Sequence, residues 1–100
     1  NLRQALLDAG EKLLETKGVE GLSMRALART TGVSHAAPYR HFADKADLLA
    51  ALAARGFARL AETLVAVAAA HGDDPQREYL VACRRYMELG MDAPAMYRLM

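Results

Sequence analysis

The sequence contains only one cysteine, Cys83, in 100 residues. A lone cysteine cannot form an intramolecular disulfide bond, and this is typical of proteins that stay in a reducing cytoplasm. Long apolar runs are also missing, because the alanine-rich stretch 60–70 is interrupted by Glu62 and followed by His71. The sequence therefore favours a cytoplasmic protein over a secreted disulfide scaffold or a membrane-spanning protein.

Motifs for metal binding and catalysis are missing as well. The three histidines and the cysteine do not occur at zinc-ligand spacings such as CxxC or HExxH. Neither a nucleophile elbow nor a phosphate-binding loop is present. Asp73 and Asp74 precede a proline, which is typical of a capping turn rather than of a general acid and base. We therefore expect no enzymatic activity, no metal and no cofactor.

Acidic residues are scarce in the segment from Gly21 to Lys45. Asp44 is the only acid there, and the bases of the segment are Arg25, Arg29, Arg40 and Lys45. The net charge of +1 identifies no partner by itself. A local positive field on a nearly neutral chain suits a DNA-binding protein, although a solvated helix face would show the same pattern.

The remaining pattern is entirely helical, without strand-like alternation, repeats or low-complexity linkers. The predicted helices span residues 1–17, 24–30, 35–41, 45–70, 75–91 and 95 onward. Gly18 ends the first helix, whose inward stripe is predicted at Leu2, Leu6, Ala9 and Leu13, with Leu14 flanking it. The proline-free stretch 45–70 predicts a rod of roughly 40 Å. We expect Asp44 and Asp74 to cap the helices that follow them.

The stretch from Ser23 to Lys45 organises the rest of the chain. Ser23 can cap the helix that follows it, and Gly32 can adopt the left-handed conformation that ends this helix. Ser34 is then placed to cap a second helix of two turns, which Phe42 would anchor to the core. Two short helices joined by a tight glycine turn predict a helix-turn-helix motif.

The outer face of this second helix carries side chains that suit a DNA major groove. We predict base contacts from Arg25, His35, Ala36 and Ala37 and phosphate contacts from Tyr39, Arg40, His41 and Lys45, with Ser34 at the same surface. The alternative is an ordinary helical corner with Tyr39 half-buried. Such a corner would serve a helical protein-interaction module that docks a partner helix and does not bind DNA.

Several short sequence runs in this region resemble one protein family. The runs Gly21-Leu22-Ser23-Met24-Arg25-Ala26-Leu27-Ala28, Gly32-Val33-Ser34 and Tyr39-Arg40-His41-Phe42, followed by Lys45 and Leu48-Leu49, resemble the DNA-binding domain of the TetR/AcrR family of bacterial transcriptional regulators. The resemblance covers about residues 2–53. The run Ser34-His35-Ala36-Ala37-Pro38-Tyr39 is similar to the corresponding sequence of a subgroup with a WHG-type regulatory domain. Pro38 departs from the usual family pattern, and we expect an irregular first turn there.

The resemblance implies two domains and a longer chain. Residues 1–45, completed to about 53, would form the DNA-binding domain, and residues 46–100 would begin an effector-binding and dimerisation domain. The implied protein is a homodimeric repressor that an unknown small molecule, expected to be apolar, releases from a palindromic operator. The start of the first helix, near Asn1 and Arg3, would lie by the DNA backbone.

Residues near the end of the chain have two interpretations. Their methionines and tyrosines are typical of a plain helical core, and Cys83 would then be a small buried side chain. The family resemblance raises the alternative of one wall of an apolar effector pocket. The candidates for that wall are Tyr79, Cys83, Tyr86, Met87 and Met96.

Overall fold

The computed structural model describes all residues from Asn1 to Met100, and every regular element is a helix. The elements are α1 (Leu2–Gly21), α2 (Met24–Thr31), the short 3₁₀-helix η1 (Pro38–Arg40), α3 (Lys45–His71), α4 (Pro75–Asp92) and α5 (Pro94–Leu99). The all-α fold class predicted from the sequence is confirmed. No helix is both long enough and apolar enough to cross a membrane.

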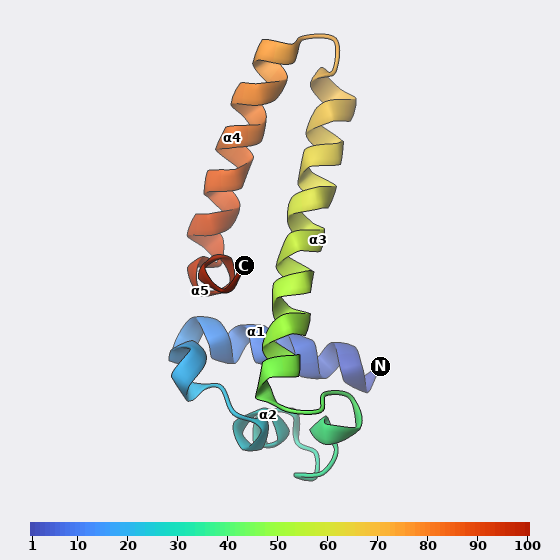
Figure 1. Ribbon diagram of the computed structural model, residues 1–100, viewed down its shortest axis with the longest axis vertical. Helices are drawn as coiled ribbons and strands as arrows, with labels where there is room; N and C mark the ends of the chain where they lie inside the picture. Colours follow the sequence, from blue (N-terminus) through green and yellow to red (C-terminus); the bar gives the residue numbers. More distant parts are fainter.

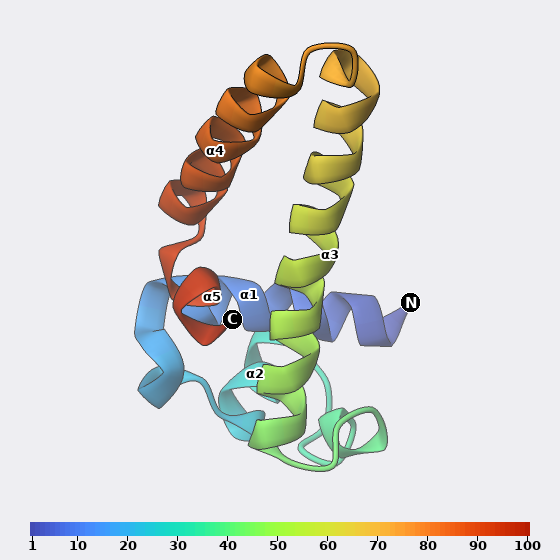
Figure 2. The same ribbon diagram turned by 45° about the horizontal axis from the view of Figure 1, so that its top comes forward.

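The molecule is elongated, with extents of 52 × 24 × 19 Å. α1, α2, η1 and the beginning of α3 form a base (Figure 1). The rest of α3 rises from this base, and α4 returns beside it in the opposite direction. α5 then lies next to α1, as both views show (Figures 1 and 2). The end of the chain therefore packs on its beginning.

The first helix differs from its prediction in two ways. Gly18 interrupts the regular helix with φ 73° and ψ 177°, but helical backbone resumes after it and continues to Gly21. The buried residues are Leu6, Leu7, Gly10 and Leu14, so the predicted inward stripe was rotated by about one position. A Cβ at Gly10 would lie 3.5 Å from the Leu52 side chain, an ordinary van der Waals distance, so Gly10 lies in the contact between α1 and α3 with room for a methyl group.

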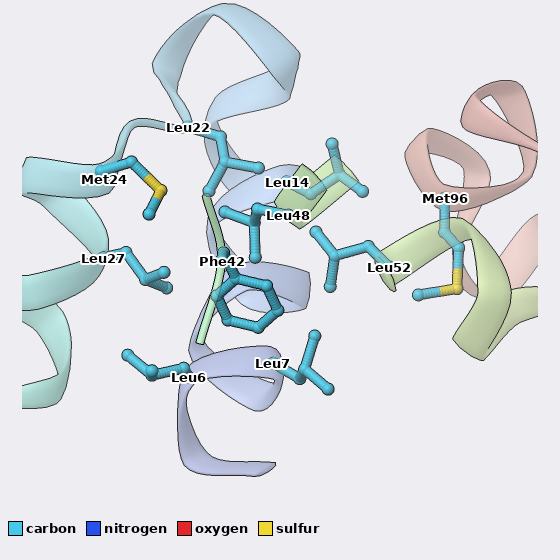
Figure 3. Close-up of a cluster of buried hydrophobic side chains, with 10 residues drawn as sticks. All are labelled: Leu6, Leu7, Leu14, Leu22, Met24, Leu27, Phe42, Leu48, Leu52 and Met96. Carbon is cyan, nitrogen blue, oxygen red and sulfur yellow. The ribbon is translucent and has the colours of Figure 1, made fainter. Parts of the chain in front are cut away.

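A single apolar core holds the base together. Ten buried side chains from α1, α2, α3, α5 and the connecting segments form it: Leu6, Leu7, Leu14, Leu22, Met24, Leu27, Phe42, Leu48, Leu52 and Met96. The Phe42 ring lies among leucines of three elements (Figure 3). Burying a side chain of this size contributes about 1.5–3 kcal/mol. Phe42 thus anchors the end of residues 34–42, the stretch that contains η1 and is called the η1 segment below, as the sequence predicted.

A cluster of ion pairs joins α1 to α3 beside this core. The Arg55 guanidinium lies 2.7 Å from the Asp8 carboxylate and 3.0 Å from that of Glu11, and Arg59 lies 2.7 Å from Glu11. Desolvation by burial lowers the pKa of Arg55, but hydrogen bonds to Asp8 and Glu11 outweigh it, so the pKa is raised overall. Arg55 and Arg59 in the middle of α3 therefore stabilise the packing of α1 on α3.

The helices of the second half begin where the sequence predicted. The Asp44 carboxylate accepts a hydrogen bond from the Asp47 amide at 2.9 Å, and the Asp74 carboxylate accepts one from the Arg77 amide at 3.2 Å. Asp47 in turn accepts from the Ala43 amide at 3.0 Å. α4 contains no buried residue. Most of its large apolar side chains remain exposed, and Val81 and Leu89 are partly buried.

Candidate nucleic-acid interface

The turn after α2 has the geometry that its sequence predicts. The Ser23 hydroxyl accepts a hydrogen bond from the Ala26 amide at 3.0 Å and caps the start of α2. Gly32 ends the helix in the left-handed conformation, with φ 74° and ψ 32°. The Val33 amide then donates to the Ala28 carbonyl at 3.0 Å. The turn directs the chain away from α2 and toward the solvent side of the base.

The predicted second helix over residues 35–41 is wrong. Residues 35–37 form turns, and only Pro38–Arg40 is helical, as a 3₁₀-helix. The Ala37 amide donates to the Ser34 carbonyl at 3.1 Å, so Ser34 contributes its backbone and no side-chain cap. Pro38 has no N–H with which to form the next α-helical bond. The backbone from Pro38 to Arg40 is therefore wound as a 3₁₀-helix instead of an α-helix.

This segment nevertheless has a buried side and an exposed side. Ala37 is 5% exposed and Pro38 is fully buried, while Phe42 closes the segment at 2% exposure. Ala37 therefore faces the core, and its predicted place among the base-contacting residues is not supported. The candidate residues that remain exposed are Ser34, His35, Ala36, Tyr39, Arg40 and His41. Tyr39 keeps 56% of its surface exposed, which is a large fraction for a tyrosine.

Several cations surround this exposed side. Arg25 is exposed in the first turn of α2, and Arg40 is exposed within η1. The Lys45 ammonium donates a hydrogen bond to the Val19 carbonyl, which leaves its other N–H groups available. The Arg3 guanidinium lies 5.4 Å above the centre of the Phe42 ring, a cation–π contact between the start of α1 and the end of the segment. Sequence reasoning had no signal for that contact.

None of these cations is engaged in an ion pair. Every salt bridge involves Arg55, Arg59, Arg84 or Arg85, and none involves Arg3, Arg25 or Arg40. The cations at the exposed side of the base therefore have no carboxylate partner within the chain. Unpaired cations around one exposed segment are what a polyanionic partner requires.

The candidate effector residues are only partly brought together. Tyr79, Cys83, Tyr86 and Met87 line an entirely apolar hollow of about 430 Å³ between α3 and α4, together with Leu64 and Ala82. Cys83 is exposed there, so its expected burial is wrong. Met96 lies elsewhere, 1% exposed in the core of the base. It belongs to α5 and lies in the buried cluster near Leu52 (Figure 3).

Comparison with known proteins agrees with this geometry. Residues 6–52 match the model of the bacterial regulatory proteins of the TetR family. The chain is 39% identical over 82 residues to the HTH-type transcriptional repressor AcnR of Corynebacterium efficiens, an alignment that covers 77% of this chain and 44% of the relative. AcnR of Corynebacterium glutamicum is 38% identical over 82 residues, which again cover 77% of this chain and 44% of the relative. The chain thus spans less than half the length of these relatives.

A solved structure extends the similarity to the whole chain. It is a protein of unknown function from Rhodococcus sp. RHA1, with 39% sequence identity and a TM-score of 0.88. The match covers 100% of this chain and 52% of that protein. With the capped α2, the left-handed Gly32 turn and the exposed η1 segment, these matches confirm the resemblance seen in the sequence, and the chain belongs to the TetR family of bacterial regulatory proteins.

Proposed function

We propose that the protein is a transcriptional regulator that binds duplex DNA through the η1 segment and the cations around it. The observation that carries this proposal is the set of unpaired cations beside an exposed segment that the core anchors from behind. Family membership and the repressor names of the AcnR relatives support the same function. On this basis we infer a repressor rather than an activator.

The contacts divide into two classes. Arg25, His35 and Ala36 are proposed to read base edges, because arginine and histidine can donate hydrogen bonds there and an alanine methyl can lie against thymine. The residues proposed to contact phosphate, with Ser34 beside them, are Tyr39, Arg40, His41 and Lys45. Phosphate contacts set affinity and base contacts set sequence preference.

The protein is proposed to act as a homodimer with two domains per chain. Residues 1–45, completed to about 53, would hold the DNA-reading part, and residues 46–100 would begin the part that binds an effector and a second copy. Two-fold symmetry would present two η1 segments to successive major grooves about 34–36 Å apart, so the operator would be a rough palindrome. Two chains per operator is the expected stoichiometry.

Release from DNA is proposed to follow the binding of an apolar small molecule in the α3–α4 hollow. The lining is wholly apolar, with two tyrosine rings and a methionine at its edge. A ligand can shift the protein away from its DNA-binding conformation only if it binds the other conformation more tightly. The hollow lies beside the part of α3 that rises above the base. A ligand there would change the spacing between α3 and α4, and α3 would carry that change to the base.

Removing one phosphate contact and one base contact should have different effects. Arg40→Ala should weaken binding to every duplex and reduce the slope of log K against log salt by about 0.9. His35→Ala should instead change the order of preference among operator variants, because it removes a contact to base edges and no obligatory charge. Fluorescence anisotropy of labelled duplexes over a salt series measures both quantities.

Arg84→Ala is the matched control, because Arg84 is an exposed arginine on α4, far from η1. It should leave both the affinity and the salt slope unchanged. Equal losses on all duplexes from Arg40→Ala and His35→Ala would contradict the division into two classes. A helical module that docks proteins would show no salt-dependent retention on immobilised duplex DNA at all, and Tyr39→Ala would then change nothing.

A further inference from the structure

The backbone of the segment between Ser34 and Phe42 is wound more tightly than an α-helix. Three of its bonds join residues three apart: Ala37 amide to Ser34 carbonyl at 3.1 Å, Arg40 amide to Ala37 carbonyl at 3.1 Å, and His41 amide to Pro38 carbonyl at 3.0 Å. Only the last bond, from the Phe42 amide to the Pro38 carbonyl at 3.0 Å, joins residues four apart. From this we propose that Pro38 is a positioning residue for sequence recognition. The proposal rests on the DNA-binding function proposed above.

Pro38 acts from the buried side of the segment. Its ring is fully buried, and its nitrogen cannot donate to the Ser34 carbonyl four residues back. Ala37 has φ −61° and ψ −44°, a helical conformation that a following proline disfavours. The segment therefore keeps this shape because Pro38 and Ala37 are packed into the base. The shape exists before any DNA is present.

The tight winding changes where the exposed side chains lie relative to one another. Three residues of a 3₁₀-helix advance by about 6 Å and one full turn, whereas three residues of an α-helix advance by about 4.5 Å and 300°. Across the bond from the Arg40 amide to the Ala37 carbonyl, this winding carries Arg40 about 1.5 Å farther along and 60° farther round than an α-helix would, and so changes its position relative to the exposed residues that precede Ala37.

A displacement of this size matters for base recognition. Hydrogen bonds to base edges form over a range of only about 0.5 Å in donor–acceptor distance. If Tyr39 and Arg40 hold the phosphates, the position of His35 and Ala36 over the base pairs depends on the winding between them. Pro38 sets that winding without touching DNA, so it determines which base pairs are read rather than how strongly DNA is held.

Selection of binding sites from a random duplex library tests this role in the full-length protein. Pro38→Ala restores the missing N–H and permits α-helical winding. We expect its selected half-site to differ from that of the parent, and the ratio of affinities for the two selected sites to change at least tenfold. Affinity for random duplex DNA at the same salt should stay within about threefold, because the phosphate contacts remain.

Two further variants separate positioning from stability. Pro75→Ala removes an exposed proline from the first turn of α4 and should leave the selected site unchanged. Pro38→Val restores the N–H but keeps a branched side chain in the core, and it should shift the selection as Pro38→Ala does. A ratio of two affinities measured on one preparation does not depend on the folded fraction, so partial unfolding cannot produce the shift.

The outcomes are distinct. If the parent selects a site and both Pro38 variants select the same one, Pro38 has only a structural role and the inference is overturned. If neither the parent nor the variants select any site, the proposed DNA-binding function fails, and the role of Pro38 fails with it. A shifted half-site in both variants, with Pro75→Ala unchanged, supports the inference.

Discussion

Two glycines of this chain illustrate how one position can require a residue type and another merely tolerate it. Gly32 has a positive φ of 74° at the end of α2, and nothing lies within 4 Å of an added Cβ. Gly90 also has open space around it, but it lies in regular helix within α4. Since neither site is crowded, any difference between alanine substitutions at the two positions reports backbone conformation alone.

We therefore expect opposite effects from the same substitution. Gly32→Ala should destabilise the protein by about 1–2 kcal/mol, because an L-residue is strained in the left-handed region. Gly90→Ala should stabilise it by about 0.5–1 kcal/mol, since alanine favours helix interiors. Urea unfolding monitored by circular dichroism measures both. A similar sign for the two variants would mean that neighbouring structure relaxes around Gly32.

Among the elements, α5 depends most on the rest of the molecule. It has six residues, too few to be stable alone, and no side chain of its own caps its beginning. The Glu15 carboxylate of α1 accepts hydrogen bonds from the amides of Ala95 and Met96 at 2.9 and 3.0 Å instead. Met96 is then buried in the core of the base. An acidic side chain from a distant helix thus replaces the missing cap.

Replacing Glu15 should release α5 without unfolding the base. Glu15→Ala should lower stability by about 1 kcal/mol, as the loss of a helix cap does, and should speed hydrogen exchange at the Ala95 and Met96 amides. Glu20→Ala, which removes an exposed carboxylate near the end of α1, should change neither quantity. Unchanged exchange at Ala95 in Glu15→Ala would show that Met96 packing alone holds α5.

The elements that the sequence predicted well are those set by local chemistry. Ser23, Gly32, Asp44 and Asp74 all mark helix ends, because each acts on backbone groups within a few residues. The η1 segment was predicted as an α-helix in which Pro38 would disturb only the first turn. In the structure Pro38 is buried, and bonds between residues three apart continue to His41.

Contacts between distant residues left no such local signal. Glu15 meets α5 across 80 residues of sequence, and Arg55 meets Asp8 across 47. The orientation of Ala37 was missed for the same reason, because its burial depends on how the segment packs on the base. Of the candidate site, the exposed residues of the segment and its local excess of cations could be predicted, but its winding and the contact between Arg3 and Phe42 could not.

At the scale of the whole molecule, apolar side chains are divided unevenly. The base is filled by the core, whereas Val67 is the only buried residue of the α3–α4 pair beyond Gly56. Tyr79, Met87 and Met91 remain 69%, 62% and 79% exposed along the same pair. The α3–α4 pair thus carries open apolar surface, whereas the unpaired cations of the candidate interface lie on the base, an arrangement that the proposed effector and DNA sites would require.

Filling the α3–α4 hollow should block binding of an apolar ligand there and leave DNA binding unchanged. Ala82→Phe places a ring in the hollow and should abolish the fluorescence enhancement of 1-anilinonaphthalene-8-sulfonate, with operator affinity unchanged. Ala69→Phe, at an exposed position of α3 outside the hollow, is the control and should retain the enhancement. Undiminished fluorescence in Ala82→Phe would mean that the probe binds elsewhere.

The continuous 27-residue α3 has a mechanical consequence. Leu48, Leu52 and Gly56 fix its first part to the base, which leaves an arm on the order of 22 Å between Gly56 and His71. By simple geometry, a sideways push of about 4 Å at the end of that arm tilts the rod by about 10°. Because the Lys45 ammonium at the opposite end donates a hydrogen bond to the Val19 carbonyl, we expect such a tilt to be passed to the end of α1 and so to the base as a whole.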